Sequence, residues 1–148
     1  MDVKTNRKTL IVNEFEYLCT IFIVHFMSTK IAIRPQIPSA LVNENMTLEE
    51  RFQNTTLRPV IKMQHDLLLF RLESELNQAA FENLTRAAKT QFVQNILFKG
   101  NAIRSEVIGM IAGCFTLEEY TFYRENTKTI NKRIIQIIIE RVINTLGL

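Results

Sequence analysis

The sequence predicts an all-α protein, an irregular bundle of five or six helices in a single domain. The chain holds only 4 Gly and 3 Pro among its 148 residues, which is too few turn residues for a β-sandwich or a barrel. Apolar residues recur at the spacing of a helix face in most segments. Hydrophobic residues make up 47% and charged residues 22%, so a chain of this length can bury a core without disulfides or metals.

Residues 1–30 are expected to be an extension ahead of the domain, which spans residues 31–148. An apolar stretch from Leu18 to Met27 fits helical spacing, although its β-branched residues leave a strand open. It spans about ten residues, acidic residues precede it, and no small-residue cleavage site follows, so it is not a signal peptide. It is also too short to cross a bilayer, which takes about 20 apolar residues. We therefore expect a cytoplasmic protein without membrane association. As an alternative, the native chain starts at Met27.

Two prolines define an extended linker ahead of the helices. Pro35 and Pro38 fix their own φ angles and disfavour the helical region for Arg34 and Ile37, which precede them. The chain from Ile31 to Met46 is therefore expected to be extended.

Two identical four-residue patterns mark helix starts. Thr47-Leu48-Glu49-Glu50 and Thr116-Leu117-Glu118-Glu119 both fit a capping box, in which the threonine hydroxyl and the last carboxylate each bind a backbone N–H group. The first box predicts a short helix to about Asn54, and the second predicts one through Tyr123. The patterns lie 69 positions apart, and an internal duplication is one open explanation.

The first long helix is expected to run from Leu57 to Asn77, with a proline in its first turn. Thr55 or Thr56 can cap it. Leu67 and Phe70 widen its apolar stripe, so more than one neighbour must pack on it.

Two further helices are expected to meet at a tight corner. Asn83 or Thr85 can start the first of them, which Gly100 ends. Asn101 can then cap the second, which reaches Gly113. These two helices should be antiparallel neighbours or cross at a sharp angle.

The last helix is expected to begin at Asn126 or Thr127 and to carry an almost continuous apolar surface. Its apolar residues are Ile130, Ile134, Ile135, Ile137, Ile138, Ile139, Val142, Ile143 and Leu146. Such a helix must be surrounded on most sides. It is either the central helix of the bundle or an element shared with a second copy, which would make a homo-oligomer through Ile130–Leu146.

Few residues could bind a metal ion, and their spacing is unfavourable. Cys19 and His25 are six positions apart, about 240° around a helix, so they cannot point at one ion. We interpret Cys19 and Cys114 as reduced, buried thiols. The sequence has no phosphate-binding glycine loop and no nucleophile elbow. We therefore expect no metal, no cofactor and no catalytic residue.

The charge is spread evenly along the sequence. The net charge is +3, and residues 1–30, 31–116 and 117–148 contribute +1 each. Because no basic patch stands out in sequence, we expect no nucleic-acid binding.

Four residues form a candidate ligand-binding site: His65, Tyr120, Tyr123 and Arg133. A helix-borne imidazole beside Asp66 can act as a base or a ligand, and tyrosines can form an aromatic wall. The alternative is that these residues have only structural roles. In that case the histidine lies at the core edge, bonded to a neighbouring helix, and the tyrosines fill the core.

From Arg34 to Leu146 the chain resembles a small family of uncharacterised, all-helical bacterial proteins. The similarity is carried by Arg34-Pro35-Gln36-Ile37-Pro38-Ser39, Phe52-Gln53-Asn54, Leu57-Arg58-Pro59, Lys62-Met63-Gln64-His65-Asp66-Leu67, Phe115-Thr116-Leu117-Glu118-Glu119-Tyr120 and Asn131-Lys132-Arg133. Some look-alikes carry the label glyoxalase, which implies βαβββ units with metal ligands on strands. Neither is expected in this chain.

These observations favour a non-catalytic helical protein that works by interaction or self-association. The alternative is a small-molecule-binding protein or enzyme with a pocket near His65, Tyr120, Tyr123 and Arg133.

Overall fold

The computed structural model describes residues 29–76 and 79–148. The chain divides into two units, Met1–Ile33 and Arg34–Leu148. In the first unit, residues 29–32 are helical, and the N–H of Ile33 donates to the carbonyl of Thr29. The predictions for residues 1–28, which include the apolar stretch, a start at residue 27 and the roles of residues 19 and 25, lie outside the described residues.

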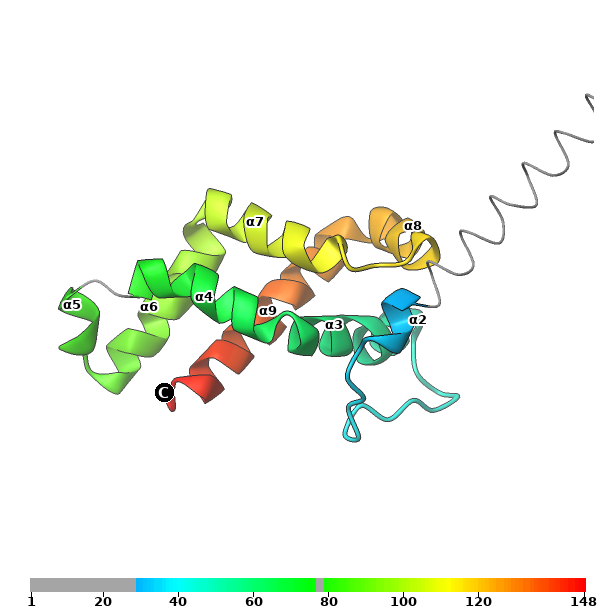
Figure 1. The fold of residues 1–148 in the computed structure, drawn as a ribbon, viewed down its shortest axis with the longest axis horizontal. Helices are drawn as coiled ribbons and strands as arrows, with labels where there is room; N and C mark the ends of the chain where they lie inside the picture. The colour runs from blue at the N-terminus through cyan, green and yellow to red at the C-terminus, as the bar shows by residue number, and fades with distance from the viewer. Residues whose placement is uncertain (1–28, 77–78) are drawn as a thin grey trace, which may run out of the picture. The chain divides into compact units, whose positions relative to one another are not determined.

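The regular structure of the second unit is helical, and its described part has no strand, which confirms the predicted all-α fold class (Figure 1). In chain order its elements are α2 (Leu48–Phe52), the π-helix η1 (Gln53–Leu57), α3 (Arg58–Met63), α4 (His65–Leu76), α5 (Ala79–Glu82), α6 (Arg86–Lys99), α7 (Asn101–Ala112), α8 (Leu117–Glu125) and α9 (Thr127–Thr145).

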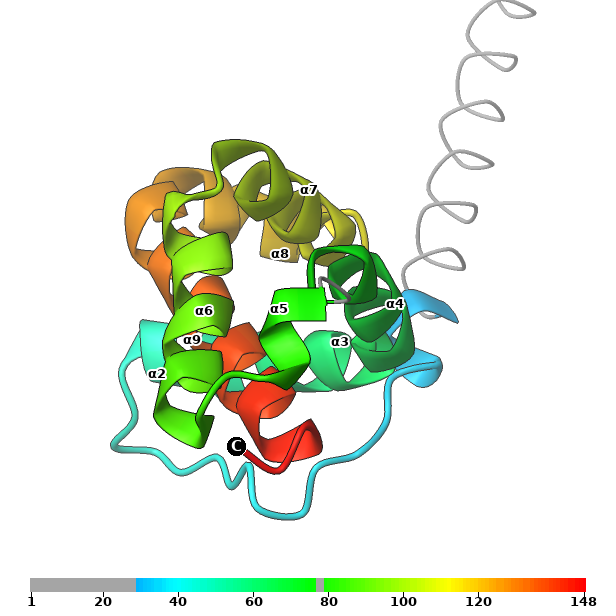
Figure 2. The same cartoon turned by 90° about the vertical axis from the view of Figure 1, so that its left-hand side faces the viewer.

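The last helix, α9, is the centre of this unit. This agrees with the first of the two interpretations of its sequence, a central helix of the bundle. It contacts α3, α6, α7 and α8, and Figure 2 shows these elements around it. Ile134, Ile135 and Ile138 are at most 1% exposed. Among the apolar residues of Ile130–Leu146, Leu146 is the one that is exposed. Self-association through this helix stays a prediction, and the chain's own packing already covers most of the apolar surface it would use.

The predicted extended linker over residues 31–46 is present from residue 34, where the chain is irregular, with turns at residues 38–39 and 44–45. Residues 31 and 32 are helical, so the prediction is wrong for these two positions. Side chains of η1 and α3 bind the backbone of the linker. Asn54 Nδ2 donates to the carbonyl of Leu41 at 3.0 Å, and Lys62 Nζ lies 3.4 Å from the carbonyl of Gln36. The linker therefore follows the surface of the bundle.

The predicted break between residues 54 and 56 is wrong, because the chain stays helical from α2 through η1 into α3. Thr55 does not cap a helix, and its hydroxyl donates back to the carbonyl of Arg51. Pro59 explains the π-helix. Its ring would crowd the preceding turn of an α-helix and it offers no N–H, whereas the wider turn, in which Arg58 donates to Gln53, accommodates it.

The predicted helix over residues 57–77 is divided in two at Gln64, whose φ and ψ are −88° and 6°. Hydrogen bonds still cross the division, because Gln64 donates to Val60 and Leu68 donates to Gln64, both at 2.9 Å. The Gln64 side chain donates to Cys114 Sγ at 3.0 Å. Cys114 is half-buried rather than fully buried, as a free thiol.

The predicted corner between α6 and α7 is present, with a different cap. Thr85 caps α6 by accepting from the N–H of Ala88, as predicted. Asn101 is not the cap of α7 but its first residue, and Gly100 precedes it. A Cβ atom at Gly100 would lie 2.5 Å from the carbonyl oxygen of Ile96, so the glycine is needed for close backbone approach.

Candidate functional site

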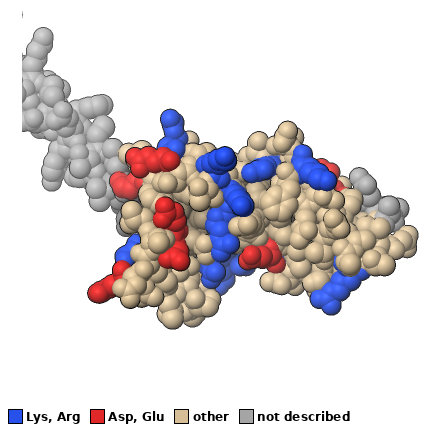
Figure 3. Space-filling model, turned by 180° about the vertical axis from the view of Figure 1, so that it is seen from behind, with Lys and Arg blue, Asp and Glu red and all other residues tan. Residues whose placement is uncertain are grey.

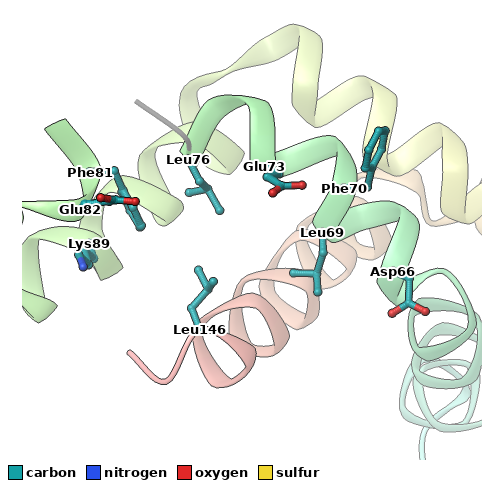
Figure 4. A pocket seen from close by; sticks show the side chains of 9 residues that line it. All are labelled: Asp66, Leu69, Phe70, Glu73, Leu76, Phe81, Glu82, Lys89 and Leu146. Atoms are coloured by element: carbon teal, nitrogen blue, oxygen red, sulfur yellow. The ribbon is translucent and has the colours of Figure 1, made fainter. Parts of the chain in front are cut away.

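A hollow of about 570 Å³ opens between α4, α5, α6 and the residue that follows α9 (Figure 4). It is lined by Asp66, Leu69, Phe70, Glu73, Leu76, Phe81, Glu82, Lys89 and Leu146. Leu69, Leu76 and Leu146 point toward one another across it. Its volume lies in the range of roughly 300–1,000 Å³ that is usual for binding pockets.

One face of α4 supplies most of the wall. Its lining residues start at Asp66 and follow at the third, fourth, seventh and tenth positions after it, which places them on one side of a helix. The core side of α4 buries Leu68 and Leu72, each 2% exposed. By contrast Phe70 is 76% exposed and Leu67 is 58% exposed. α4 is therefore apolar on two faces, and only one of them is covered within the described chain.

The end of α9 places Leu146 at the hollow. Gly147 has a φ of 66°, a left-handed conformation that glycine adopts without strain. The N–H of Leu148 donates to Ile143 at 3.0 Å and that of Gly147 to Asn144 at 3.3 Å, which is a Schellman motif. The motif ends the helix, and Leu146 is left 39% exposed.

Charged side chains surround the apolar lining. Asp66, Glu73 and Glu82 are exposed carboxylates. Among the described residues of the lining Lys89 is the one cation, and its Nζ lies 5.5 Å from the centroid of the Phe81 ring. The hollow thus combines an apolar centre with a mainly acidic edge, a composition suited to an amphipathic ligand with positive charge.

The structure does not bring the four predicted ligand residues together. His65 Nε2 lies 3.1 Å from Thr145 Oγ1, at the end of α9. Thr145 is 12 residues from Arg133 on the same helix, about 18 Å along its axis. His65 is next in sequence to Asp66 and so lies beside the hollow without lining it. This contact with another helix agrees with the alternative prediction, in which His65 is a histidine at the core edge bonded to a neighbouring helix.

The two tyrosines pack with each other and with the core. Tyr123 is 8% exposed, and its hydroxyl donates to Asn131 Oδ1 at 2.8 Å. Its ring centroid lies 5.7 Å from that of Phe115 and 5.6 Å from that of Tyr120, which is 41% exposed. Tyr123 therefore acts in packing, with its polar end satisfied internally.

Arg133 lines a smaller pocket of about 290 Å³, together with Glu49, Glu50, Lys132 and uncharged neighbours. Its Nε donates to Gln53 Oε1. The pocket therefore brings carboxylates and cations to one place, on the side of the molecule where α2 meets α9.

A polar cluster joins the linker to the start of α8. Arg34 donates to both carboxylate oxygens of Glu119, at 2.6 and 2.7 Å, and to the carbonyl of Cys114 at 2.9 Å. The hydroxyl of Thr56 and the N–H of Thr116 also donate to Glu119, each at 2.8 Å. Only 5% of the Arg34 side chain and 16% of the Glu119 side chain are exposed.

This environment lowers the pKa of Glu119. Burial acts in the opposite direction, since it disfavours the charged carboxylate, but the hydrogen bonds from Arg34, Thr116 and Thr56 and the charge of Arg34 outweigh it. Glu119 is fully bonded and lies under the linker, so the cluster holds the fold together.

Sequence reasoning missed the hollow, although one signal for it was visible. The apolar width of α4 indicated a second neighbour beside Leu67 and Phe70, and no described residue of the chain buries either side chain. The meeting of α4, α5 and the end of α9 depends on long-range packing, which local spacing does not reveal.

Basic side chains gather on one face. Figure 3 shows Lys and Arg in a band across the middle of this face, with acidic side chains beside it. The expectation of no nucleic-acid binding rests on an even distribution along the sequence, which says nothing of such a band, so it stays a prediction.

No protein-family model matches the chain, and neither a curated protein nor a solved structure is significantly similar to it. The resemblance to bacterial helical proteins and the glyoxalase label are therefore untested by comparison. Within residues 29–76 and 79–148, no three His, Cys, Asp or Glu side chains are grouped as a metal site would require. In the same ranges, no helix has the length and apolar character needed to cross a bilayer.

Proposed function

We propose that this protein is a non-catalytic helical interaction protein, and that an amphipathic helix of a partner protein binds at the α4 hollow. The observation that carries the proposal is the uncovered apolar face of α4. Phe70 is 76% exposed at the rim of a hollow whose centre is formed by leucines. Burying one phenylalanine side chain stabilises by roughly 1.5–3 kcal/mol, so a partner that covers this face gains a substantial part of its affinity there.

The shape of the hollow favours a helix as the occupant. Its walls are α4 on one side and α5 with α6 on the other, and an amphipathic helix places apolar residues into such a groove at every third or fourth position. The described chain has no sheet edge to which an extended peptide could add a strand.

Peptide binding to the full chain tests the proposal. The probe is a fluorescent peptide of about 18 residues, long enough to be helical, with Leu along one face and Gln elsewhere. We expect it to bind the wild type, and expect Phe70→Ser to weaken binding by about tenfold or more. Because Phe70 is exposed, the variant should fold normally.

Leu117→Ser is the matched control, since Leu117 is 63% exposed on α8, away from the hollow. Equal loss in both variants, or no binding to the wild type, would contradict the proposal. Sedimentation velocity adds a further test. A dimer that Phe70→Ser dissociates would make the occupant a second copy of the chain, and would overturn the assignment to a partner protein.

A small-molecule function has one observation in its favour, the charged pocket around Arg133. Glu49, Glu50, Lys132 and Arg133 together suit a ligand that carries both charges, such as a free amino acid. Thermal-shift measurements with amino acids would show stabilisation of the wild type and none of Arg133→Gln. No response to any of them would exclude this alternative.

A further inference from the structure

The edge of the α4 hollow carries a charge opposite to that of the whole chain. Of the residues that the structure describes, three carboxylates and one ammonium line it, a local excess of two negative charges, whereas the complete chain has a net charge of +3. The charge at the hollow therefore favours a basic partner, although the chain as a whole is positively charged.

The three carboxylates are not used within the described chain. Asp66, Glu73 and Glu82 form no ion pair with any described residue. By contrast, Glu75 on the same helix forms an ion pair, with its Oε1 3.4 Å from Arg71 Nη1. α4 therefore pairs the glutamate that faces away from the hollow and leaves Glu73, on the hollow side, available.

The single cation of the lining lies at one end. Lys89 is on α6, where its ammonium rests over the Phe81 ring. Asp66 and Glu73 lie along α4, on the opposite side of the leucine cluster. The long acidic side of the hollow is thus separate from its positive end.

We propose that the hollow selects a basic amphipathic helix, with apolar residues that enter between Leu69, Leu76 and Leu146 and with Lys or Arg beside Asp66 and Glu73. This inference rests on the proposed function and adds the chemistry of the partner to it. The apolar centre supplies affinity, and the uncompensated carboxylates decide which charge the partner carries.

Three peptides that share the same Leu positions test the inference on the full chain. Their polar positions are all Lys, all Gln or all Glu. We expect the Lys peptide to bind about tenfold tighter than the Gln peptide at low salt, as a few exposed charge pairs would give, and the Glu peptide to bind most weakly. The difference between the Lys and Gln peptides should shrink as salt is added, because exposed charges are screened.

A triple variant locates the preference. Asp66→Asn with Glu73→Gln and Glu82→Gln should bind the Lys and Gln peptides equally. The control variant neutralises three exposed glutamates elsewhere, Glu44, Glu125 and Glu140, and makes the same change in net charge. It should keep the preference for the Lys peptide.

The outcomes separate the two proposals. If the Lys and Gln peptides bind the wild type equally, the inference about charge fails while the interaction site stands. If the Glu peptide binds best, the net charge of the chain governs binding and the inference is overturned. If none of the three binds, the proposed function fails as well.

Discussion

The two Thr-Leu-Glu-Glu segments begin helices in the same way but stand in different surroundings. At α2, Thr47 and Glu50 form a capping box with bonds of 2.9 and 3.2 Å, on the exposed surface. At α8, Thr116 and Glu119 form the same box with bonds of 2.8 and 3.3 Å, in a part-buried site. Identical sequence therefore produces identical local geometry at both places.

The difference lies in what reaches each box from elsewhere in the chain. Glu119 also accepts from Arg34 and Thr56, which are 85 and 63 positions away. Glu50 has only its local bond to Thr47 among the described hydrogen bonds. The comparison teaches that four residues determine how a helix begins, while distant residues determine how much that beginning contributes to stability.

The largest expected effect comes from removing the carboxylates. Glu119→Ala leaves the guanidinium of Arg34 buried without its counter-charge and should lower the free energy of unfolding by about 3 kcal/mol. Glu50→Ala removes one exposed capping bond and should cost roughly 0.5–1 kcal/mol. Urea unfolding followed by far-ultraviolet circular dichroism measures both. Equal losses would show that the long-range contacts of Glu119 add nothing.

The next largest difference between the two capping boxes is expected at low pH, in their contributions to the free energy of unfolding. Protonation removes the charge of Glu119 but keeps its side chain. The pKa of Glu119 is lowered in the folded state, after burial has raised it and its hydrogen bonds have more than offset that rise. Its contribution to stability is therefore complete above the pKa of an unfolded glutamate, about 4.3, and is lost as the pH falls through the lower folded pKa.

Urea unfolding at stepped pH from about 6 to 3 checks this loss. Glu119→Gln should flatten the decrease in the free energy of unfolding, and Glu50→Gln should retain the part that Glu119 provides. If Glu119→Gln follows the wild-type curve, the ion pair with Arg34 makes no contribution.

The capping hydroxyls should differ by less. Thr116 is 4% exposed, and its hydroxyl lies between Glu119 N–H and a Glu118 oxygen. Thr116→Ala should cost about 1.5 kcal/mol, and Thr47→Ala about 0.5 kcal/mol, because water can replace the lost bond at the exposed cap. Thermal unfolding of each variant gives the comparison, and a larger loss for Thr47→Ala would contradict it.

The smallest effect is expected where the two segments are alike. Leu48 is 69% exposed and Leu117 is 63% exposed. Substituting either one by Gln should change the free energy of unfolding by less than about 0.5 kcal/mol, as is usual for exposed sites. A clear loss at only one position, in the same unfolding assay, would reveal a contact that distinguishes the segments further.

The sequence was sufficient for features that depend on neighbours in the chain. Both capping boxes, the Thr85 cap and the α6–α7 corner follow from a few adjacent residues. The central position of α9 follows from an apolar surface too wide for one neighbour. In these cases a local rule and the tertiary packing require the same structure.

Other features depend on competition between local and distant effects. Thr55 and Thr56 are of a residue type that often caps helices, yet the chain remains helical there, and the Thr56 hydroxyl donates to Glu119. Asn101 is a good cap by type, but it is the first residue of α7, and Gly100, which lies close to the backbone of Ile96, occupies the cap position. His65 and Arg133 lie apart because His65 contacts Thr145, which is 12 residues after Arg133 on α9.

The π-helix at Gln53–Leu57 sets the rotation of α2, which directly precedes it, about the helix axis. A π turn takes one residue more than an α turn, and one residue corresponds to about 100° around a helix. Deleting Thr55 would remove this residue and swing Phe52 away from the rings of Phe115 and Phe122, which it now meets at 5.6 and 4.9 Å. The orientation of α2 around the helix axis therefore depends on this one extra residue.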